Sequence, residues 1–273
     1  MCEWAAGCIP AKNVWNSTGA QAAVSVSSAC CFKNCRAIYG LRLVCCIGFP
    51  ICSEKSYEKK EFTSYNDFFT RKIRPSSRPF AEAAEAFTAP CDSKLSVYPI
   101  TEEAQFCIKD TQYTMESLTR SKRVAKEYEG GILCVFRLTV DDYHRYAFVD
   151  DGELSREFHI PGVYHTVNPV AGEYYPIYKE NTREFCIQKS RHFGHLLLME
   201  VGALLVGRIV NHDIEQTVSR GEEKGYFEFG GSTVIVAVQA GQVRIDEDIW
   251  QNSAEGIETV VKQGEKIGTG LKA

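Results

Sequence analysis

The sequence has no surplus of positive charge and no long apolar run. Its 273 residues carry 31 Lys and Arg against 35 Asp and Glu, which leaves no basic excess to neutralise the phosphates of a nucleic acid. No stretch reaches the roughly 18 apolar residues that a membrane-crossing helix needs. The nearest candidate, residues 37–52, is interrupted by Arg42 and Pro50, and is either a core segment or an apolar surface that contacts a membrane. Because the chain has no basic excess, a nucleic-acid partner is not expected.

The cysteines also lack the patterns that usually give cysteine a structural role. Twelve are present, eight of them before residue 53, without the paired C-x2-C spacing of a zinc site and without a nearby histidine. The first residues do not show the basic segment and apolar core of a secretory signal peptide, which disfavours a disulfide framework. We expect reduced, mostly buried thiols and no metal site.

The N-terminal part divides into two stretches. Residues 1–52 are rich in Ala, Ser and Cys without sustained periodicity, and we treat them as a divergent segment with a possible membrane contact. After a polar stretch at 53–60, Phe62, Tyr65, Phe68 and Phe69 recur at the spacing of an amphipathic helix. We expect Ser64 to cap this helix, and the helix to end before Pro75.

From Phe87 onward the chain consists of short apolar runs separated by Gly, Pro, Asn and Asp. Their content of Val, Ile, Leu and Phe predicts strands, at Leu95–Ile100, Gly131–Leu138, Glu184–Lys189, Leu196–Val201, Leu204–Val210, Ser232–Val238 and Gln242–Ile245. A helix is predicted over Met115–Tyr128. The expected fold class is α+β, a mainly β-sheet core with N-terminal helices.

One predicted strand is interrupted by Gly230 and Gly231 just before Ser232. Two glycines within a strand weaken it and need a reason. One interpretation is a β-bulge or hairpin turn. The other is a strained peptide whose carbonyl is exposed to the next hydroxyl. In that case the serine attacks the carbonyl, the amide becomes an ester, and elimination leaves a pyruvoyl group.

Other segments carry polar residues in distinctive settings. Taken alone, Asp92 is typical of a turn or helix cap, and His144 of a hydrogen-bonded structural group. With residues 221–234, however, four segments resemble in order and spacing the phosphatidylserine decarboxylases, a self-processing pyruvoyl-dependent family. These segments are Phe62 to Arg78, Pro90-Cys-Asp-Ser-Lys-Leu, Asp141-Asp-Tyr-His-Arg and Met199-Glu-Val-Gly-Ala-Leu-Leu-Val-Gly. The resemblance covers about residues 60–270.

The resemblance implies a role for each matching residue. Gly231–Ser232 is the implied scissile bond, and Ser232 the precursor of a covalent pyruvoyl cofactor. Asp92 would orient a histidine in the self-cleavage triad, and His144 would hold the substrate carboxylate or handle a proton. The catalytic domain would span 60–273, cut into a large chain to 231 and a small chain of 232–273 that remain one domain.

One position departs from the family pattern. Many members carry a second histidine three residues after the first, as the base that activates the serine, and here that position is Ala147. Either His144 does both jobs, or another histidine supplies the base, or the chain does not process. Our candidate is His165, in a Tyr-His-Thr-Val-Asn-Pro segment that also resembles the family.

The implied reaction converts phosphatidylserine to phosphatidylethanolamine and carbon dioxide through a Schiff base. Alternatives are an unprocessed lipid-binding homologue, a pyruvoyl decarboxylase of a related aminophospholipid, and a lipoyl-like binding module. The implied location is peripheral, at the cytoplasmic face of an anionic membrane. A run of basic residues is either a lipid-binding patch or a solvated helix end, and consists of Arg71, Lys72, Arg74 and Arg78.

Overall fold

The computed structural model describes residues 58, 62–108, 111–162, 181–202, 208–213, 216–228 and 232–271. Internal contacts divide the chain into two units, Met1–Ile47 and Gly48–Ala273, and every described residue belongs to the second unit. The predictions for residues 1–52, His165 and Gly231, and most of the strand predicted at Leu204–Val210, lie outside the described residues.

An antiparallel sheet of nine strands forms the centre of the described unit. Its order is β12-β7-β9-β10-β14-β5-β2-β16, and β8 pairs with β9. The strands are β2 (Ser93–Pro99), β5 (Ile132–Leu138), β7 (Gly152–Leu154), β8 (Phe158–Ile160), β9 (Arg183–Ser190), β10 (His195–Val201), β12 (Thr217–Val218), β14 (Ser232–Val238) and β16 (Thr259–Val261). Branched and aromatic side chains dominate the central strands, as expected for a pleated, buried surface.

Smaller elements complete the fold. Two three-stranded sheets have the orders β1-β17-β15 and β11-β13-β6, and β3 and β4 form a hairpin. Their bounds are β1 (Ala86–Thr88), β3 (Phe106–Ile108), β4 (Thr111–Tyr113), β6 (Arg145–Ala147), β11 (Ile209–Asn211), β13 (Glu223–Phe227), β15 (Val243–Ile245) and β17 (Lys266–Gly270). The described helices are α3 (Tyr65–Phe69), α4 (Met115–Thr119), α5 (Lys122–Glu127) and α6 (Glu247–Ala254), with a 3-10 turn at Pro75–Ser77.

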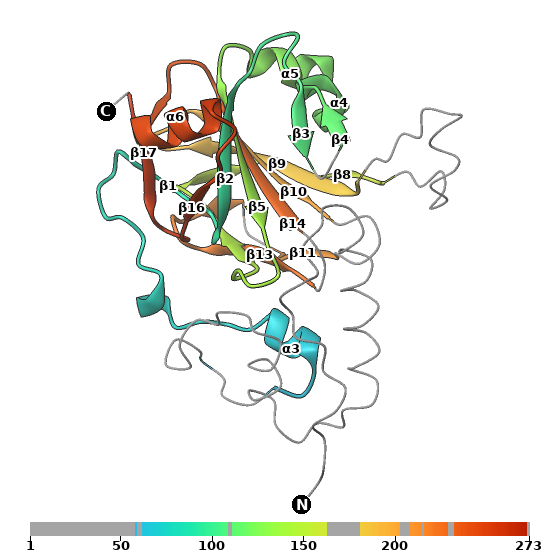
Figure 1. Cartoon of the computed structure of the whole chain (residues 1–273), viewed down its shortest axis with the longest axis vertical. Coiled ribbons are helices and arrows are strands. Elements are labelled where there is room, and N and C mark those ends of the chain that lie inside the picture. The colour runs from blue at the N-terminus through green and yellow to red at the C-terminus, as the bar shows by residue number, and fades with distance from the viewer. Residues whose placement is uncertain are drawn as a thin grey trace, which may run out of the picture. The chain divides into compact units, whose positions relative to one another are not determined.

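The large sheet separates two hydrophobic cores, because successive side chains of a strand point to opposite faces. On β14, Val234, Val236 and Val238 enter the core shared with α6 and the two small sheets, which we call the α6-side core. Ile235 and Ala237 enter the core shared with α4, α5 and the β3–β4 hairpin. Figure 1 shows α6 and β17 on one side of the sheet, and α4, α5, β3 and β4 on the other.

The predicted strands are confirmed wherever the structure describes them, and Ser232–Val238 has the predicted bounds. The helices differ more from expectation. Ser64 caps α3 as predicted, accepting a hydrogen bond from the Asp67 amide, and α3 ends at Phe69, before Pro75 as expected. The single helix expected over Met115–Tyr128 is divided at Arg120, whose φ of 53° lies in the left-handed region. Of the described helices, α3, α4 and α5 precede β5, whereas the longest, α6, lies near the C-terminal end.

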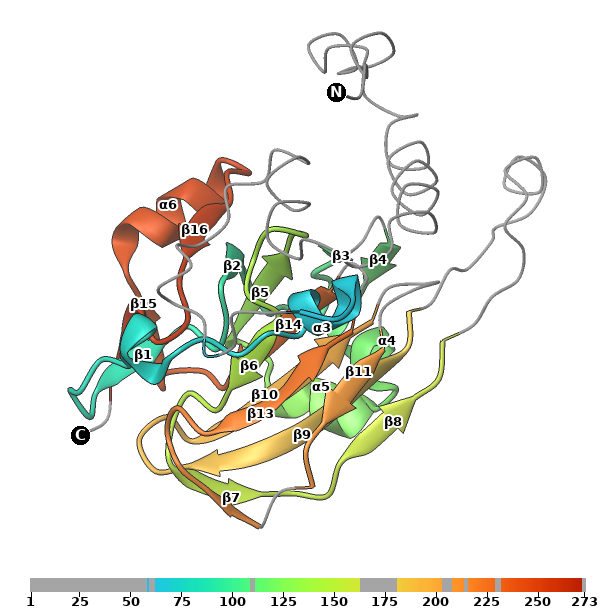
Figure 2. The same cartoon turned by 90° about the horizontal axis from the view of Figure 1, so that it is seen from below.

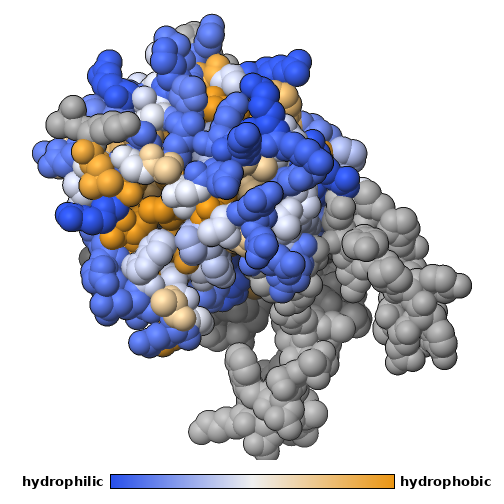
Figure 3. Space-filling model, turned by 90° about the horizontal axis from the view of Figure 1, so that it is seen from above, coloured by the Kyte–Doolittle hydropathy of each residue, from blue (hydrophilic) through white to orange (hydrophobic). Residues whose placement is uncertain are grey.

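The described thiols agree with the expected reduced state. Cys91, Cys134 and Cys186 are free and buried, and burial raises the pKa of Cys134 and Cys186 to about 12. On the face drawn in Figure 3, hydrophilic residues surround a smaller apolar patch. Within the described residues, none of the helices combines the length and apolar character that crossing a membrane requires.

The two-core arrangement predicts where truncation is costly. Leu198 on β10 is 3% exposed in the α6-side core, and Leu198→Ala should lower the free energy of unfolding by about 2–5 kcal/mol. Val260 is 63% exposed, and Val260→Ala should change the free energy of unfolding by less than about 0.5 kcal/mol. Urea unfolding measures both values, and equal losses would contradict this description of the core.

Candidate active site

The pairing of the central strands brings the predicted site segments to one end of the large sheet. β14 begins at Ser232, which lies opposite Leu138, the last residue of β5. β2, on the other side of β5, begins directly after Asp92. β10 ends opposite Thr233, on the other side of β14. Because neighbouring strands lie about 4.8 Å apart, the start of β2 lies about 10 Å from Ser232. We call this region the Ser232 end of the sheet.

Ser232 is a buried serine whose hydroxyl forms no structural hydrogen bond within the described residues. Its side chain is 1% exposed, and its Oγ has no hydrogen-bond partner in the described part of the structure. An unsatisfied buried hydroxyl costs about 1–3 kcal/mol, so it needs an explanation such as a chemical role. Ser232 faces the α6-side core, whereas the neighbouring Thr233 faces the opposite side of the sheet.

Asp92 is held by cations. Arg78 donates to both carboxylate oxygens, at 2.7 Å from Nε and 2.5 Å from Nη2. The backbone amide of Gln263 donates at 2.9 Å, and Lys262 Nζ lies 3.3 Å away. Burial alone would raise the pKa of Asp92, but these hydrogen bonds and positive charges lower it on balance. The predicted contact between Asp92 and a histidine is not among the bonds of the described residues.

His144 lies in the segment between β5 and β6 and is 1% exposed. Its Nδ1 lies 2.9 Å from the Asp142 carbonyl oxygen, which can only accept, so Nδ1 carries the proton. Nε2 is then the basic nitrogen of the neutral ring. The ring packs on Phe69 of α3, with 3.9 Å between centroids. The Phe227 amide donates to the His144 carbonyl, which ties His144 to the strand that leads to Ser232.

Arg145 joins α3 to this region. Its guanidinium donates to the Thr70 carbonyl at the end of α3 and to the carboxylate of Glu223 on β13. Figure 2 shows α3 beside the strands at this end of the molecule. The same hydrogen bonds therefore place the predicted entry segment, the histidine motif and β13 together.

Ala147 occupies the position where a second histidine was expected. It is 5% exposed, and its amide donates to the Pro90 carbonyl at 3.0 Å. The backbone at Ala147 therefore lies directly beside the segment that carries Asp92. A methyl group cannot take a proton, so Ala147 leaves this position without a base.

The histidines with weaker sequence context have other partners. The rings of His159, His192 and His212 lie within hydrogen-bonding distance of the carboxylates of Glu184, Asp150 and Glu223, and His195 is exposed. His165 lies outside the described residues and stays a prediction. The described residues on either side of its segment, Ile160 and Arg183, pair with each other, and Arg183 pairs with Val201 at the Ser232 end.

A buried polar cluster beside Ser232 was not predicted. Glu200 on β10 is 1% exposed and its Oε2 lies 2.7 Å from Lys224 Nζ, which is also buried. Lys224 also contacts Glu157 at 3.1 Å, and Asn211 donates to both glutamates. One indication of this cluster was present in the sequence, because Glu200 is a charged residue within the apolar run Leu196–Val201. The residues around Lys224 show no comparable pattern.

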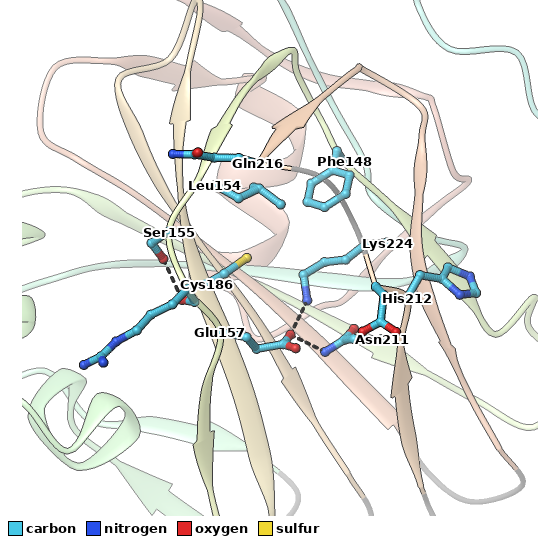
Figure 4. Close-up of a pocket in the computed structure, with 11 residues that line it drawn as sticks. Phe148, Leu154, Ser155, Glu157, Cys186, Asn211, His212, Gln216 and Lys224 are labelled. Carbon is cyan, nitrogen blue, oxygen red and sulfur yellow. Dashed lines mark hydrogen bonds and ion pairs between the residues drawn. The ribbon is translucent and has the colours of Figure 1, made fainter.

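A cavity of about 470 Å³ borders this cluster. Lys224, Glu157 and Asn211 contribute to its wall, and Figure 4 shows the Lys224 amine directed toward the Glu157 carboxylate. The exposed side chain of Glu157 connects the buried Lys224 with the solvent. No group of three or more His, Cys, Asp or Glu in the described ranges is placed to hold a metal ion.

The predicted basic patch is divided by the fold. Lys72 and Arg74 are exposed. Arg71 is buried, with its guanidinium 4.5 Å from the Phe68 ring centroid, and Arg78 is bound to Asp92. Only the first two side chains therefore offer their charge to an external surface.

Comparison with known proteins agrees with the site. The family model described as phosphatidylserine decarboxylase matches residues 65–269. The chain is 48% identical over 212 residues to phosphatidylserine decarboxylase proenzyme 2 of Clostridium acetobutylicum, covering 78% of this chain and 72% of the relative. It is 39% identical over 221 residues to the phosphatidylserine decarboxylase proenzyme of Clostridium novyi, covering 80% and 75%. The proenzyme of Clostridium tetani is 42% identical over 211 residues, with coverage of 76% and 71%.

The cationic surroundings of Asp92 predict an acid-sensitive contribution to stability. Asp92→Asn should lower the free energy of unfolding at pH 7 by about 3 kcal/mol, because Arg78 loses its anionic partner. The folded-state pKa lies below the usual 3.8, so this contribution is present above pH 3.8 and is lost as the pH falls further. Urea unfolding of both proteins between pH 3 and pH 7 measures it. If the stability difference between the wild-type protein and Asp92→Asn grew below pH 3.8, the lowered pKa of Asp92 would be contradicted.

Proposed function

Because this chain belongs to the phosphatidylserine decarboxylase family, we propose that it removes the carboxyl group of phosphatidylserine as carbon dioxide and releases phosphatidylethanolamine. The observation that carries the proposal is the buried Ser232 at the start of β14, whose hydroxyl, like that of Thr233, has no partner in the described part of the structure. Its position directly after two glycines matches a serine that cuts its own chain.

Self-cleavage would use the atoms of residues 231 and 232 alone, apart from one water. The Ser232 hydroxyl loses its proton and attacks the Gly231 carbonyl carbon. The peptide C–N bond breaks, the nitrogen takes up a proton, and an ester joins Gly231 to Ser232 Oγ. Removal of the Cα proton of residue 232 then expels the Gly231 carboxylate. Water hydrolyses the remaining enamine through its imine form, releasing ammonia and leaving a pyruvoyl group.

The residues around Ser232 fit such a group. The position is buried at the end of a fully buried strand, which protects a reactive carbonyl from water. A pyruvoyl group supplies a ketone that binds the substrate amine and accepts the electrons released with carbon dioxide. With Nδ1 donating to Asp142, Nε2 of His144 can take up a proton, and in that protonated form it can hold the substrate carboxylate or return the proton; its ring position is set by Asp142 and Phe69.

The fold also explains how two chains would stay together. β14 would begin the small chain, and it pairs with β5 of the large chain along its whole length and with β10 from Thr233 to Val238. Its alternate side chains fill both hydrophobic cores. Cutting before Ser232 therefore leaves the central strand in place.

The lipid substrate requires access to a membrane surface, and we propose peripheral attachment at the cytoplasmic face. Lys72 and Arg74, next to α3, are exposed and carry charge that attracts anionic lipids. Each such residue near a membrane surface contributes about 1 kcal/mol. The site end of the sheet, to which Arg145 ties α3, would then face the lipid.

The function is tested by substituting the two adjacent hydroxyl residues. Ser232→Ala should give an uncut chain that releases no carbon dioxide from phosphatidylserine vesicles. Thr233→Val removes the neighbouring hydroxyl on the opposite face, and this variant should still be cut and remain active. A denaturing gel and a carbon dioxide assay report the two properties. An active, cut Ser232→Ala protein would exclude the proposal, and an uncut wild-type chain that binds phosphatidylserine would favour the non-catalytic homologue.

Membrane attachment is tested by reversing exposed charge. The double variant Lys72→Glu, Arg74→Glu should bind vesicles containing anionic lipid at least 10-fold more weakly, because about 1 kcal/mol is lost for each removed cation. The matched control, Lys122→Glu with Arg123→Glu, changes two exposed residues of α5 by the same charge. Vesicle sedimentation measures the binding, and equal weakening in both variants would contradict a specific role for Lys72 and Arg74.

A further inference from the structure

Glu200 and Ser232 face the same side of the large sheet on adjacent strands. Glu200 pairs directly with Val234, which lies two residues after Ser232 on β14. Paired residues of an antiparallel sheet point to the same face, and so do residues two apart on one strand. Glu200 and Ser232 are therefore diagonal neighbours about 7–8 Å apart at the backbone, a separation that a long side chain can bridge.

Both side chains have an unused hydrogen-bonding atom. Oε1 of Glu200 and Oγ of Ser232 are buried, and within the described structure neither has a partner. One is an acceptor and the other carries a donor proton. Leaving each unsatisfied costs about 1–3 kcal/mol. Ser93 Oγ and Gln188 Oε1 on the same face are also without a partner, but they lie on β2 and β9, whereas Glu200 lies on a strand adjacent to that of Ser232.

The surroundings of Glu200 suit a proton acceptor. Lys224 holds Oε2 in place at 2.7 Å and keeps a positive charge beside the carboxylate, leaving Oε1 available. Burial raises the pKa of Glu200, although Lys224 opposes this, so the carboxylate is a stronger base than an exposed glutamate.

Neighbouring acidic groups are already engaged. Asp92 has both oxygens bound by Arg78. Glu184, the direct partner of Glu200 on β9, contacts His159 through Oε1 and Asn211 through Oε2. Ala147 has no titratable group at all. Among the described carboxylates discussed for this face, Glu200 is the one whose unpartnered oxygen is buried.

We propose that Glu200, ion-paired with Lys224, accepts the hydroxyl proton of Ser232 during self-cleavage. It would thereby take the role of the histidine that many family members carry at the position of Ala147. The proton moves from Ser232 Oγ to Glu200 Oε1 as Oγ bonds to the Gly231 carbonyl carbon. The peptide C–N bond then breaks, and the proton passes to the departing nitrogen. Glu200 ends the step as a carboxylate, so the step needs no other reactant. The inference rests on self-cleavage at Ser232.

The test follows cleavage of freshly made precursor in a cell-free translation reaction. Glu200→Gln keeps an oxygen that accepts from Lys224 but cannot take up a proton, and cleavage should slow by about 100-fold or more. Glu184→Gln removes the same charge one strand further from Ser232 and should be cut at the wild-type rate. A wild-type chain that is never cut would refute self-cleavage itself. A wild-type rate for Glu200→Gln would refute only the role of Glu200.

Two further measurements separate this role from a structural one. If Glu200→Gln does not fold, the double variant Glu200→Gln, Lys224→Met removes both buried charges, which is a tolerated change in many proteins. A folded double variant should remain uncut, and normal cutting would overturn the proposal. Hydroxylamine cleaves esters, so release of fragments by hydroxylamine from Glu200→Gln would place Glu200 in the later elimination step and also overturn it.

His165 provides the competing outcome. If His165 is the base, His165→Ala should stop cleavage while Glu200→Gln is cut at the wild-type rate, and that pair of results would contradict our proposal. Our proposal predicts the reverse, with His165→Ala cut within a few-fold of the wild-type rate.

Discussion

The pairing of β14 with β5 on one side and β10 on the other determines the position of every group at the site. This register places Ser232 opposite the end of β5 and diagonal to Glu200. A shift by one residue would turn Ser232 to the opposite face and move the valines of β14 out of the α6-side core. Burial of those valines therefore stabilises the same register that the chemistry needs.

The buried charges are arranged in two separate groups around this strand. Arg78 and Asp92 form one group, in which both carboxylate oxygens are satisfied and the pKa of Asp92 is lowered. Glu200 and Lys224 form the other, in which one oxygen is not used. A fully satisfied pair orients its segment of the chain, whereas a carboxylate with a spare oxygen can exchange a proton. The two acids therefore have different physical properties although both are buried.

The sequence alone predicted the long central strands well, because their apolar runs are local and strongly patterned, whereas the strands of two to five residues mostly had no prediction. Ser232–Val238 was predicted to the residue. The break at Arg120 was not predicted, since neither glycine nor proline marks it. The partners of Asp92 were missed as well. Arg78 lies 14 positions away and Gln263 lies 171 positions away, so folding alone brings them together. Glu200 was visible as a charge within an apolar run, but its pairing with Lys224 depends on the packing of β13 against β10.

The central claim is that the chain cuts itself between Gly231 and Ser232, and the intact mass of the purified protein tests it most directly. The account predicts two fragments that meet at this bond. The smaller fragment, 232–273, should lack a free amino terminus and should gain mass with a carbonyl-specific reagent. A single chain of full mass that does not react with that reagent would contradict the account.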